Sequence, residues 1–269
     1  IHSLDAKKKF AVADSTNGGH RDSITCLGTC GRFIATGGED STVRVFLRGC
    51  GELADALGAA GESEDDLRHV HTLCGSVGAV RSVDLDTTLD VVVSGDDAGV
   101  VGVYSLRRGE FVRLINVSED AAVEEGQGEG EGEVKVGVRL LRVGKDGEFV
   151  CLLDDGTLAV WTVNGACVAK ADAGTDVTCL EIAWGGQFVL LGTEGGLVKV
   201  FSFAGLREEK VLDFTGHDGV CCFASTLPDN SVDQYLLVGH VNGNVSVVTD
   251  PKHRLICLDD ALQTLPWFE

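Results

Sequence analysis

The sequence predicts an all-β fold, a β-propeller, and three observations predict it. A pattern of apolar strand, loop, second apolar strand, tight Asp/Asn/Gly turn and third strand recurs five times. The equivalent turn positions lie 58, 57, 40 and 47 residues apart, and a unit of about 40–45 residues is the length of a four-stranded propeller blade. Glycine is abundant (36) and proline scarce (3), which suits many turns and unbroken strand ladders. We therefore expect five blades, which form part of a seven-bladed wheel.

The five units occupy residues 16–249, with their first strands beginning near Ile24, Ala79, Val136, Val177 and Val220. Residues 1–15 read as the remnant of a preceding blade, and residues 250–269 as a C-terminal strand (RLICL) and tail. Acidic insertions interrupt the units at 48–70 and 118–133. The second, with its alternating Gly and Glu, is expected to be disordered. Because the sequence holds no methionine, we expect it to be a segment of a longer protein.

Composition excludes several classes of function. The formal net charge is −20, and such a field repels nucleic-acid phosphates and anionic lipid headgroups. No apolar run reaches the roughly 18 residues of a membrane span. Of the ten cysteines, Cys26, Cys179 and Cys222 fall at the same place in three repeats, where a thiol packs as a small hydrophobe. The thiols are therefore expected to be reduced, as in an intracellular protein.

The first unit carries the marks of a WD repeat most fully, and the chain resembles WD-repeat proteins in them. These marks are His20, Thr36 and Asp40, with Phe46 where tryptophan is usual. The resemblance implies that they form a structural hydrogen-bonded set that ties the blade together. A catalytic use of His20 and Asp40 is the alternative that this spacing leaves open.

Other patterns offer weaker chemistry. His69, His71 and Cys74 bring metal-binding residue types together, but no second ligand pair follows at zinc-type spacing. No nucleophile elbow, phosphate loop or dinucleotide fingerprint occurs. We expect no cofactor, no metal and no catalytic residue.

One pattern points to a binding surface. The residue at the start of the tight turn is acidic in four of the five units: Glu39, Asp97, Asp154 and Glu194, with Val241 in the fifth. In a propeller these turns lie on one face, so the carboxylates are expected to form a partial ring that binds a basic partner segment. The alternative is that acidic residues are simply common in turns.

The order of the units and their amino-acid sequences resemble those of the C-terminal propeller of BEACH-domain proteins, of the neurobeachin and beige type. The stretches GHRDSITCLGTCGRFIATGGEDSTVRVF, LLDDGTLAVWTVNGACVAK and QFVLLGTEGGLVKVFSF carry the likeness, which covers most of residues 16–249. Ala98 and Gly195, at positions where Asp is expected, are departures that leave the hydrogen-bonded sets of their blades uncertain.

The resemblance implies a non-catalytic protein-binding scaffold that acts in vesicle trafficking or lysosome-related organelle biology. It also implies an upstream BEACH domain and a cytoplasmic protein, peripheral to membranes through its upstream domains. The alternatives are a WD-repeat subunit of another multiprotein assembly and an enzyme-type propeller with a site in its central channel.

Overall fold

The computed structural model describes residues 18–48, 67–118, 136–214, 218–225, 236–248 and 255–257. These residues form 20 strands and one short 3-10 helix, η2 (Trp184–Gly186). The strands make five antiparallel sheets of four strands each, in chain order, which confirms the predicted five-bladed β-propeller. The chain divides into two compact units, residues 1–143 and 144–269, and each is described by itself.

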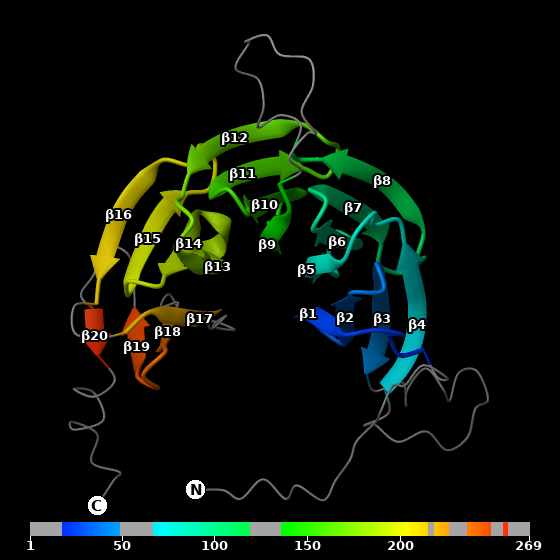
Figure 1. The fold of residues 1–269 in the computed structure, drawn as a ribbon, viewed down its shortest axis with the longest axis horizontal. Helices are drawn as coiled ribbons and strands as arrows, with labels where there is room; N and C mark the ends of the chain where they lie inside the picture. Colours follow the sequence, from blue (N-terminus) through cyan, green and yellow to red (C-terminus); the bar gives the residue numbers. More distant parts are fainter. Residues whose placement is uncertain are drawn as a thin grey trace, which may run out of the picture. The chain divides into compact units, whose positions relative to one another are not determined.

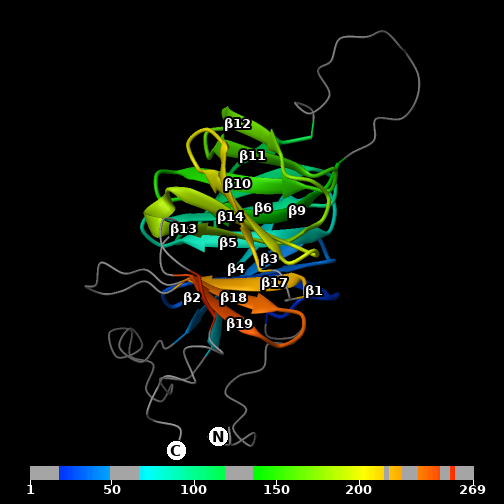
Figure 2. The same ribbon diagram turned by 90° about the vertical axis from the view of Figure 1, so that its left-hand side faces the viewer.

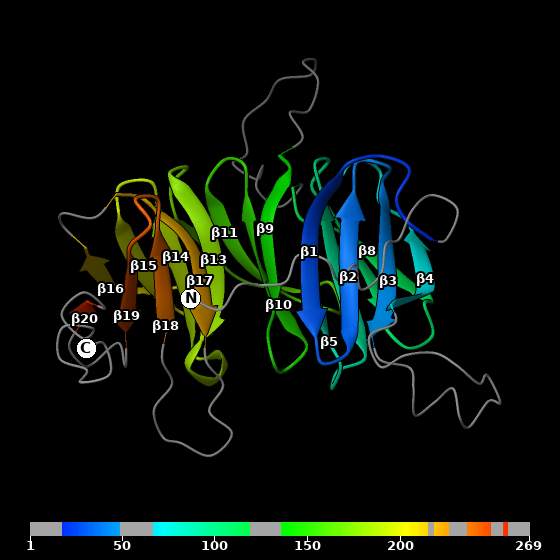
Figure 3. The same cartoon turned by 90° about the horizontal axis from the view of Figure 1, so that it is seen from below.

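The first unit contains two complete blades and one further strand. Blade 1 consists of β1 (Ile24–Cys30), β2 (Phe33–Gly38), β3 (Thr42–Arg48) and β4 (Leu67–Cys74). Blade 2 consists of β5 (Val80–Asp86), β6 (Val91–Asp96), β7 (Val100–Ser105) and β8 (Phe111–Asn116). The additional strand is β9 (Val138–Val143). In Figure 3 β1, β2 and β3, drawn in blue, lie side by side with alternating direction.

The second unit contains the rest of blade 3 and blades 4 and 5, coloured from green to red in Figure 1. Its blade 3 strands are β10 (Glu148–Leu153), β11 (Thr157–Thr162) and β12 (Cys167–Asp172). Blade 4 consists of β13 (Val177–Ala183), β14 (Phe188–Thr193), β15 (Leu197–Ser202) and β16 (Glu208–Asp213). Blade 5 consists of β17 (Val220–Ser225), β18 (Leu236–His240), β19 (Val245–Val248) and β20 (Leu255–Cys257).

The turn between the second and third strands has the same geometry in every blade. Its last residue has a positive φ, and its N–H donates to the carbonyl three residues earlier at 3.0–3.3 Å. Four of these residues are glycines, for which a left-handed conformation carries no Cβ penalty. The five positions are Ser41, Gly99, Gly156, Gly196 and Gly243. They are the positions from which the repeat was aligned in the sequence.

Successive blades pack through the first strand of the following blade. Val80 and Val83 of β5 share one buried cluster with Ala35, Val43 and Val45 of blade 1. Blade 4 and blade 5 repeat the arrangement, with Val220 against the corresponding strands of blade 4. Each buried valine contributes about 1.5–3 kcal/mol by leaving water, so this seam is a main source of stability.

A glycine on the second strand receives each of these valines. A Cβ on Gly37 would lie 2.5 Å from Val80 Cγ1, and one on Gly192 would lie 2.6 Å from Val220 Cγ1. Gly95 stands in the same relation to a valine of β9, at 2.4 Å. Glycine is needed at these places because the next blade occupies the space of a side chain.

A β-bulge in the first strand places two neighbouring side chains together beside this glycine. The register shifts between Ile24 and Cys26 in β1, and the equivalent shift occurs in β5, β13 and β17. As a result, the Thr25 hydroxyl reaches both its own blade, at Gly37 O (3.0 Å), and the carbonyl of Val80 in blade 2. Thr178 does the same in blade 4, toward Gly192 O (3.1 Å) and Val220 O (2.5 Å).

The structure extends some predicted boundaries. Leu67–Val70, assigned to the first insertion, belong to β4, and Arg48 is the last residue of β3. The strand expected in the tail is β20, which makes it the fourth strand of blade 5. Residues 1–15 and most of both insertions, 49–66 and 119–135, lie outside the described residues. Within the described part of the chain, no helix is long and apolar enough to cross a membrane.

Candidate functional site

The four predicted turn carboxylates occupy one backbone position. Each follows the last residue of the second strand of its blade, at the start of the tight turn. The N–H of Glu39 donates to Ser23 O, that of Asp97 to Ala79 O and that of Glu194 to Asp176 O, all at 2.9–3.0 Å. In the fifth blade Val241 makes the same bond, to Gly219 O. The backbone therefore fixes where each side chain leaves the turn.

All four side chains are exposed, although the second strands that precede them are largely buried. Within the first unit, Glu39 and Asp97 lie at the same end of adjacent blades, since β5 packs on both β1 and β2. Asp154 and Glu194 belong to consecutive blades of the second unit. Each pair therefore places exposed negative charge at equivalent turn positions of two consecutive blades.

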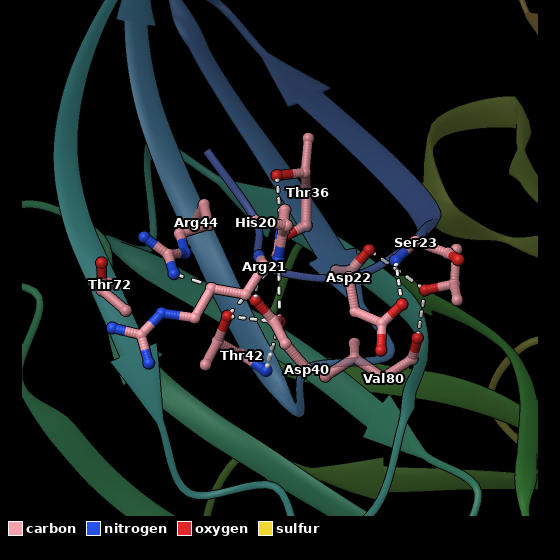
Figure 4. A network of polar contacts seen from close by, with 12 residues as sticks. His20, Arg21, Asp22, Ser23, Thr36, Asp40, Thr42, Arg44, Thr72 and Val80 are labelled. Carbon is pink, nitrogen blue, oxygen red and sulfur yellow. Dashed lines mark hydrogen bonds and ion pairs between the residues drawn. The ribbon is translucent and has the colours of Figure 1, made fainter. Parts of the chain in front are cut away.

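The structural set of blade 1 comes together around the imidazole of His20 (Figure 4). Its Nδ1 lies 2.9 Å from Asp40 Oδ1, and its Nε2 lies 2.9 Å from Thr36 Oγ1. A Cβ on Gly38 would stand only 2.6 Å from Nδ1. Gly38 is therefore a glycine because the imidazole takes the space of its side chain.

Asp40 organises the turn and the loop that precedes β1. Its Oδ1 accepts from the Thr42 hydroxyl (2.7 Å) and the Thr42 N–H (3.2 Å), and its Oδ2 accepts from the Arg21 N–H (2.9 Å). Arg44 forms an ion pair with the same carboxylate at 3.8 Å. Burial alone would raise the pKa of Asp40, but the hydrogen bonds from Thr42, Arg21 and His20 outweigh it and hold the pKa well below its usual value.

The aromatic position of the set differs from blade to blade. Phe46 makes an edge-to-face contact with His69, with 5.6 Å between ring centroids. In blade 3 the equivalent residue is Trp161, whose buried Nε1 has no hydrogen-bond partner among the described residues. The position equivalent to Thr36 is there Cys151, a fully buried thiol whose pKa is raised to about 12 by burial. The usual hydroxyl acceptor is missing because a cysteine replaces it.

In blade 2 a different carboxylate accepts the hydrogen bonds that Asp40 accepts in blade 1. Asp96, fully buried at the position of Gly38, accepts from the N–H groups of Ala98 (3.0 Å) and Val100 (2.8 Å) through Oδ1. Its Oδ2 accepts from the N–H groups of Val77 (2.8 Å) and Gly78 (3.3 Å). Val77 and Val100 are the equivalents of Arg21 and Thr42. Ala98 therefore leaves no gap in the blade.

Blades 4 and 5 also carry a buried polar residue at this position. Thr193 Oγ1 accepts from the Leu197 N–H at 3.0 Å and donates to Leu197 O at 3.1 Å. His240 lies 2.9 Å from Ser246 Oγ through Nε2 and 3.2 Å from Asp218 O through Nδ1. Sequence reasoning missed these residues, and the signal that could have found them is a polar residue ending an apolar second strand.

The alternative metal ligands serve other contacts. His71 Nε2 lies 3.0 Å from Arg107 O, and His69 Nε2 lies 3.1 Å from the Thr72 hydroxyl. Among the residues that the structure describes, no three His, Cys, Asp or Glu side chains group as metal ligands do.

Comparison with known proteins agrees with this geometry. The family model for the WD domain, G-beta repeat, matches residues 14–46, which contain the His20, Thr36 and Asp40 set. The chain is a β-propeller whose first blade is a WD repeat. Two solved structures share the fold at a TM-score of 0.57: a computationally designed protein, Ika8 (21% identity, 87% of this chain and 60% of that chain), and the WD40 β-propeller domain of Doa1 (16% identity, 88% and 69%).

The propeller also has a curated relative of the predicted kind. It is 24% identical over 249 residues to BEACH domain-containing protein B of Arabidopsis thaliana. The match takes in 87% of this chain and 9% of the length of the relative. The predicted likeness to the propeller of BEACH-type proteins is thereby confirmed.

Proposed function

We propose that this WD-repeat propeller is a non-catalytic scaffold that binds a basic segment of a protein partner through its exposed turn carboxylates. The observation that carries the proposal is the position of Glu39, Asp97, Asp154 and Glu194. All four leave the same backbone place and are exposed, while a separate set of buried polar side chains serves the hydrogen bonds of the blades. The net charge of −20 adds long-range attraction for a basic partner and disfavours nucleic acid.

The likeness to a BEACH protein supports the finer part of the proposal. A propeller of this kind would act in a cytoplasmic protein with an upstream BEACH domain, in vesicle trafficking or lysosome-related organelle biology. His20 and Asp40, the residues of the catalytic alternative, are engaged with Thr36, Thr42 and Arg21. That engagement favours the scaffold over an enzyme-type propeller.

The test compares two variants that lose the same four charges. One carries Glu39→Gln, Asp97→Asn, Asp154→Asn and Glu194→Gln. The control carries Glu110→Gln, Glu208→Gln, Glu209→Gln and Asp213→Asn, all exposed and all in or next to outer strands. The probe is a lysine-rich peptide of about 12 residues, titrated at 50 and 200 mM salt.

We expect the turn variant to bind the peptide at least tenfold more weakly than the control variant at low salt. Raising the salt should weaken binding to the unmodified propeller, because the Debye length is about 10 Å at 0.1 M and shorter above it. Equal binding by the two variants would show that net charge alone attracts the peptide, and the turn carboxylates would then have no binding role.

A further inference from the structure

The outer strand of blade 2, β8, exposes more large apolar side chains than the outer strands of blades 1, 3 and 4 do. Phe111, Val112 and Leu114 are 53%, 54% and 44% exposed. The outer strands of blades 3 and 4 expose one valine each, and that of blade 1 exposes none. Exposed apolar side chains that are grouped in this way indicate a contact surface. Together with Arg113 the three residues are called the β8 edge.

The β8 edge also has backbone groups that no neighbouring strand uses. Among the described residues β8 pairs with β7 alone, just as β12, the outer strand of its own blade, lies beyond β11 in Figure 2. The Val117 N–H donates to Gly99 O at 3.0 Å, on the side of β7. Because hydrogen bonds alternate along an antiparallel pair, the backbone groups of Asn116 and Leu114 point to the opposite, open side. An open edge of this kind is a template for an added strand.

A β-bulge places Phe111 and Leu114 on the same face of blade 2. Their partners in β7 are Tyr104 and Gly102, which lie two residues apart and therefore on one face of the sheet. The register shifts by one residue within this stretch, so residues three apart in β8 share that face. Arg113 pairs with the residue of β7 between these two partners, and it lies on the other face. The β8 edge thus has an apolar face and a basic face.

A glycine after β4 leaves the apolar face uncovered beside Phe111. The ring of Phe111 contacts that of Tyr104 edge to face, with 5.9 Å between ring centroids. A Cβ placed on Gly75 would lie 2.9 Å from the Tyr104 hydroxyl oxygen and 3.6 Å from Phe111 Cδ2. Because Gly75 has no side chain, blade 1 does not cover the phenylalanine ring at this place.

The charge at the β8 edge is opposite in sign to that of the chain. Residues 107–114 contain three arginines and one glutamate, in a chain with 42 acidic and 22 basic side chains. The side chain of Arg108 is 74% exposed and pairs with Glu110 at 3.7 Å, and Arg113 is exposed as well. At physiological ionic strength the Debye length is about 8 Å, so a ligand on this strand is attracted by the nearby cations more than it is repelled by distant carboxylates.

We propose that the β8 edge binds an extended segment of a partner protein in which apolar and acidic residues alternate, and that this segment adds to blade 2 as a further strand. Side chains alternate between the two faces of a strand. The apolar side chains of the segment therefore lie against Phe111 and Leu114, and its carboxylates lie on the face of Arg113. The site uses different residues from the turn carboxylates and takes a partner of opposite charge.

The test titrates a fluorescein-labelled peptide of ten residues, alternating valine and glutamate, with the full chain at 150 mM salt. Fluorescence anisotropy measures binding. The edge variant carries Phe111→Thr, Val112→Thr and Leu114→Thr, because threonine suits a strand but removes most of the apolar surface. The control variant carries Val168→Thr and Val211→Thr, which change exposed valines on the outer strands β12 and β16.

We expect the edge variant to bind the peptide at least tenfold more weakly than the control variant, which should match the unmodified chain. Arg108→Gln with Arg113→Gln should weaken binding at least threefold, whereas Lys170→Gln with Lys210→Gln, also exposed on outer strands, should not. The same peptide with its six central backbone nitrogens methylated should bind the unmodified chain at least tenfold more weakly. This last comparison needs no variant of the protein and holds even where a variant fails to fold.

Four results would overturn the proposal. The first is an unmodified chain that does not bind the peptide, and the second is equal binding by the edge and control variants. The third is equal binding of the methylated peptide, because strand addition requires its backbone N–H groups. The fourth is a dimer in analytical ultracentrifugation that the edge substitutions abolish, which would make a second copy of the chain the occupant.

Discussion

At the residue scale, the turn after each second strand needs an acceptor for the N–H groups around it, and the chain supplies one from different positions. Asp40 does so from within the turn, and Asp96 does so from the end of the strand two positions earlier. The requirement lies in the backbone groups, because a buried N–H without a partner costs about 1–3 kcal/mol.

Asp96 and Asp97 are neighbours with opposite expected roles, and this makes a matched pair of variants. Asp96→Ala should lower the free energy of unfolding by about 2–4 kcal/mol, because four N–H groups lose their acceptor. Asp97→Ala, in the same turn but exposed, should change it by less than about 0.5 kcal/mol. Urea denaturation of both variants measures the difference, and equal losses would contradict the role of Asp96.

Trp161 offers a second residue-scale prediction, because its buried indole N–H has no partner within the described part of the chain. Cys151→Ser would place a hydroxyl where Thr36 stands in blade 1, and Cys151→Ala would not. We expect the serine variant to be more stable than the alanine variant by about 1 kcal/mol, the net value of one hydrogen bond. Thermal unfolding of the two variants measures this difference in stability. An alanine variant of equal or higher stability would show that the serine hydroxyl does not reach Nε1.

Asp40 makes the stability of blade 1 depend on pH. Its pKa is lowered in the folded state, so its contribution is fully present above the unfolded value of about 3.9 and is lost as pH falls below that value. We expect Asp40→Asn to be less stable than the unmodified chain at pH 7 and the gap to narrow between about pH 4 and pH 2. Chemical denaturation at a series of pH values measures this gap, and a gap independent of pH would exclude the lowered pKa.

At the element scale, the first strand of each following blade packs into a seam on the blade before it. The seam between blades 4 and 5 depends on the fit of Val220 over Gly192. Gly192→Ala should destabilise the chain by about 1–3 kcal/mol through overpacking. Combined with Val220→Ala, which frees the space, the loss should be smaller than the sum of the two single losses. A double-mutant cycle measures the coupling, and strict additivity would mean that the two residues do not share the space.

The sequence predicts the elements well because the repeat marks them. The five equivalent turn positions, Ser41 and four glycines, all have a positive φ, and the strands fall on either side of them. It could not predict the role of Asp96, Thr193 and His240, because each lies at a strand end where the repeat led us to expect no polar function. Nor could it show that Asp96 is buried and Asp97 exposed, because β6 ends between them and the sequence alone does not fix that boundary.

At the scale of the whole molecule, the net charge of −20 opposes the compact state through self-repulsion. Salt screens that repulsion, so we expect the melting temperature to rise between 10 and 150 mM NaCl. The four-charge turn variant should gain less from salt than the unmodified chain, because it begins with less repulsion. Differential scanning calorimetry at both salt concentrations measures the effect. A melting temperature that falls with salt would indicate that attractive ion pairs dominate.

Blades 1 and 2 place the acceptor aspartate at two different sequence positions, and this affects how WD repeats can be recognised from sequence. The family model matches residues 14–46, the blade in which Asp40 is the acceptor for both the turn and the loop before the first strand. Blade 2 keeps the same hydrogen bonds with an aspartate at a different position, Asp96. A search for WD repeats could therefore accept a polar residue either within the turn, as at Asp40, or at the end of the second strand, as at Asp96. We expect such a search to detect divergent blades that a match to one fixed position misses.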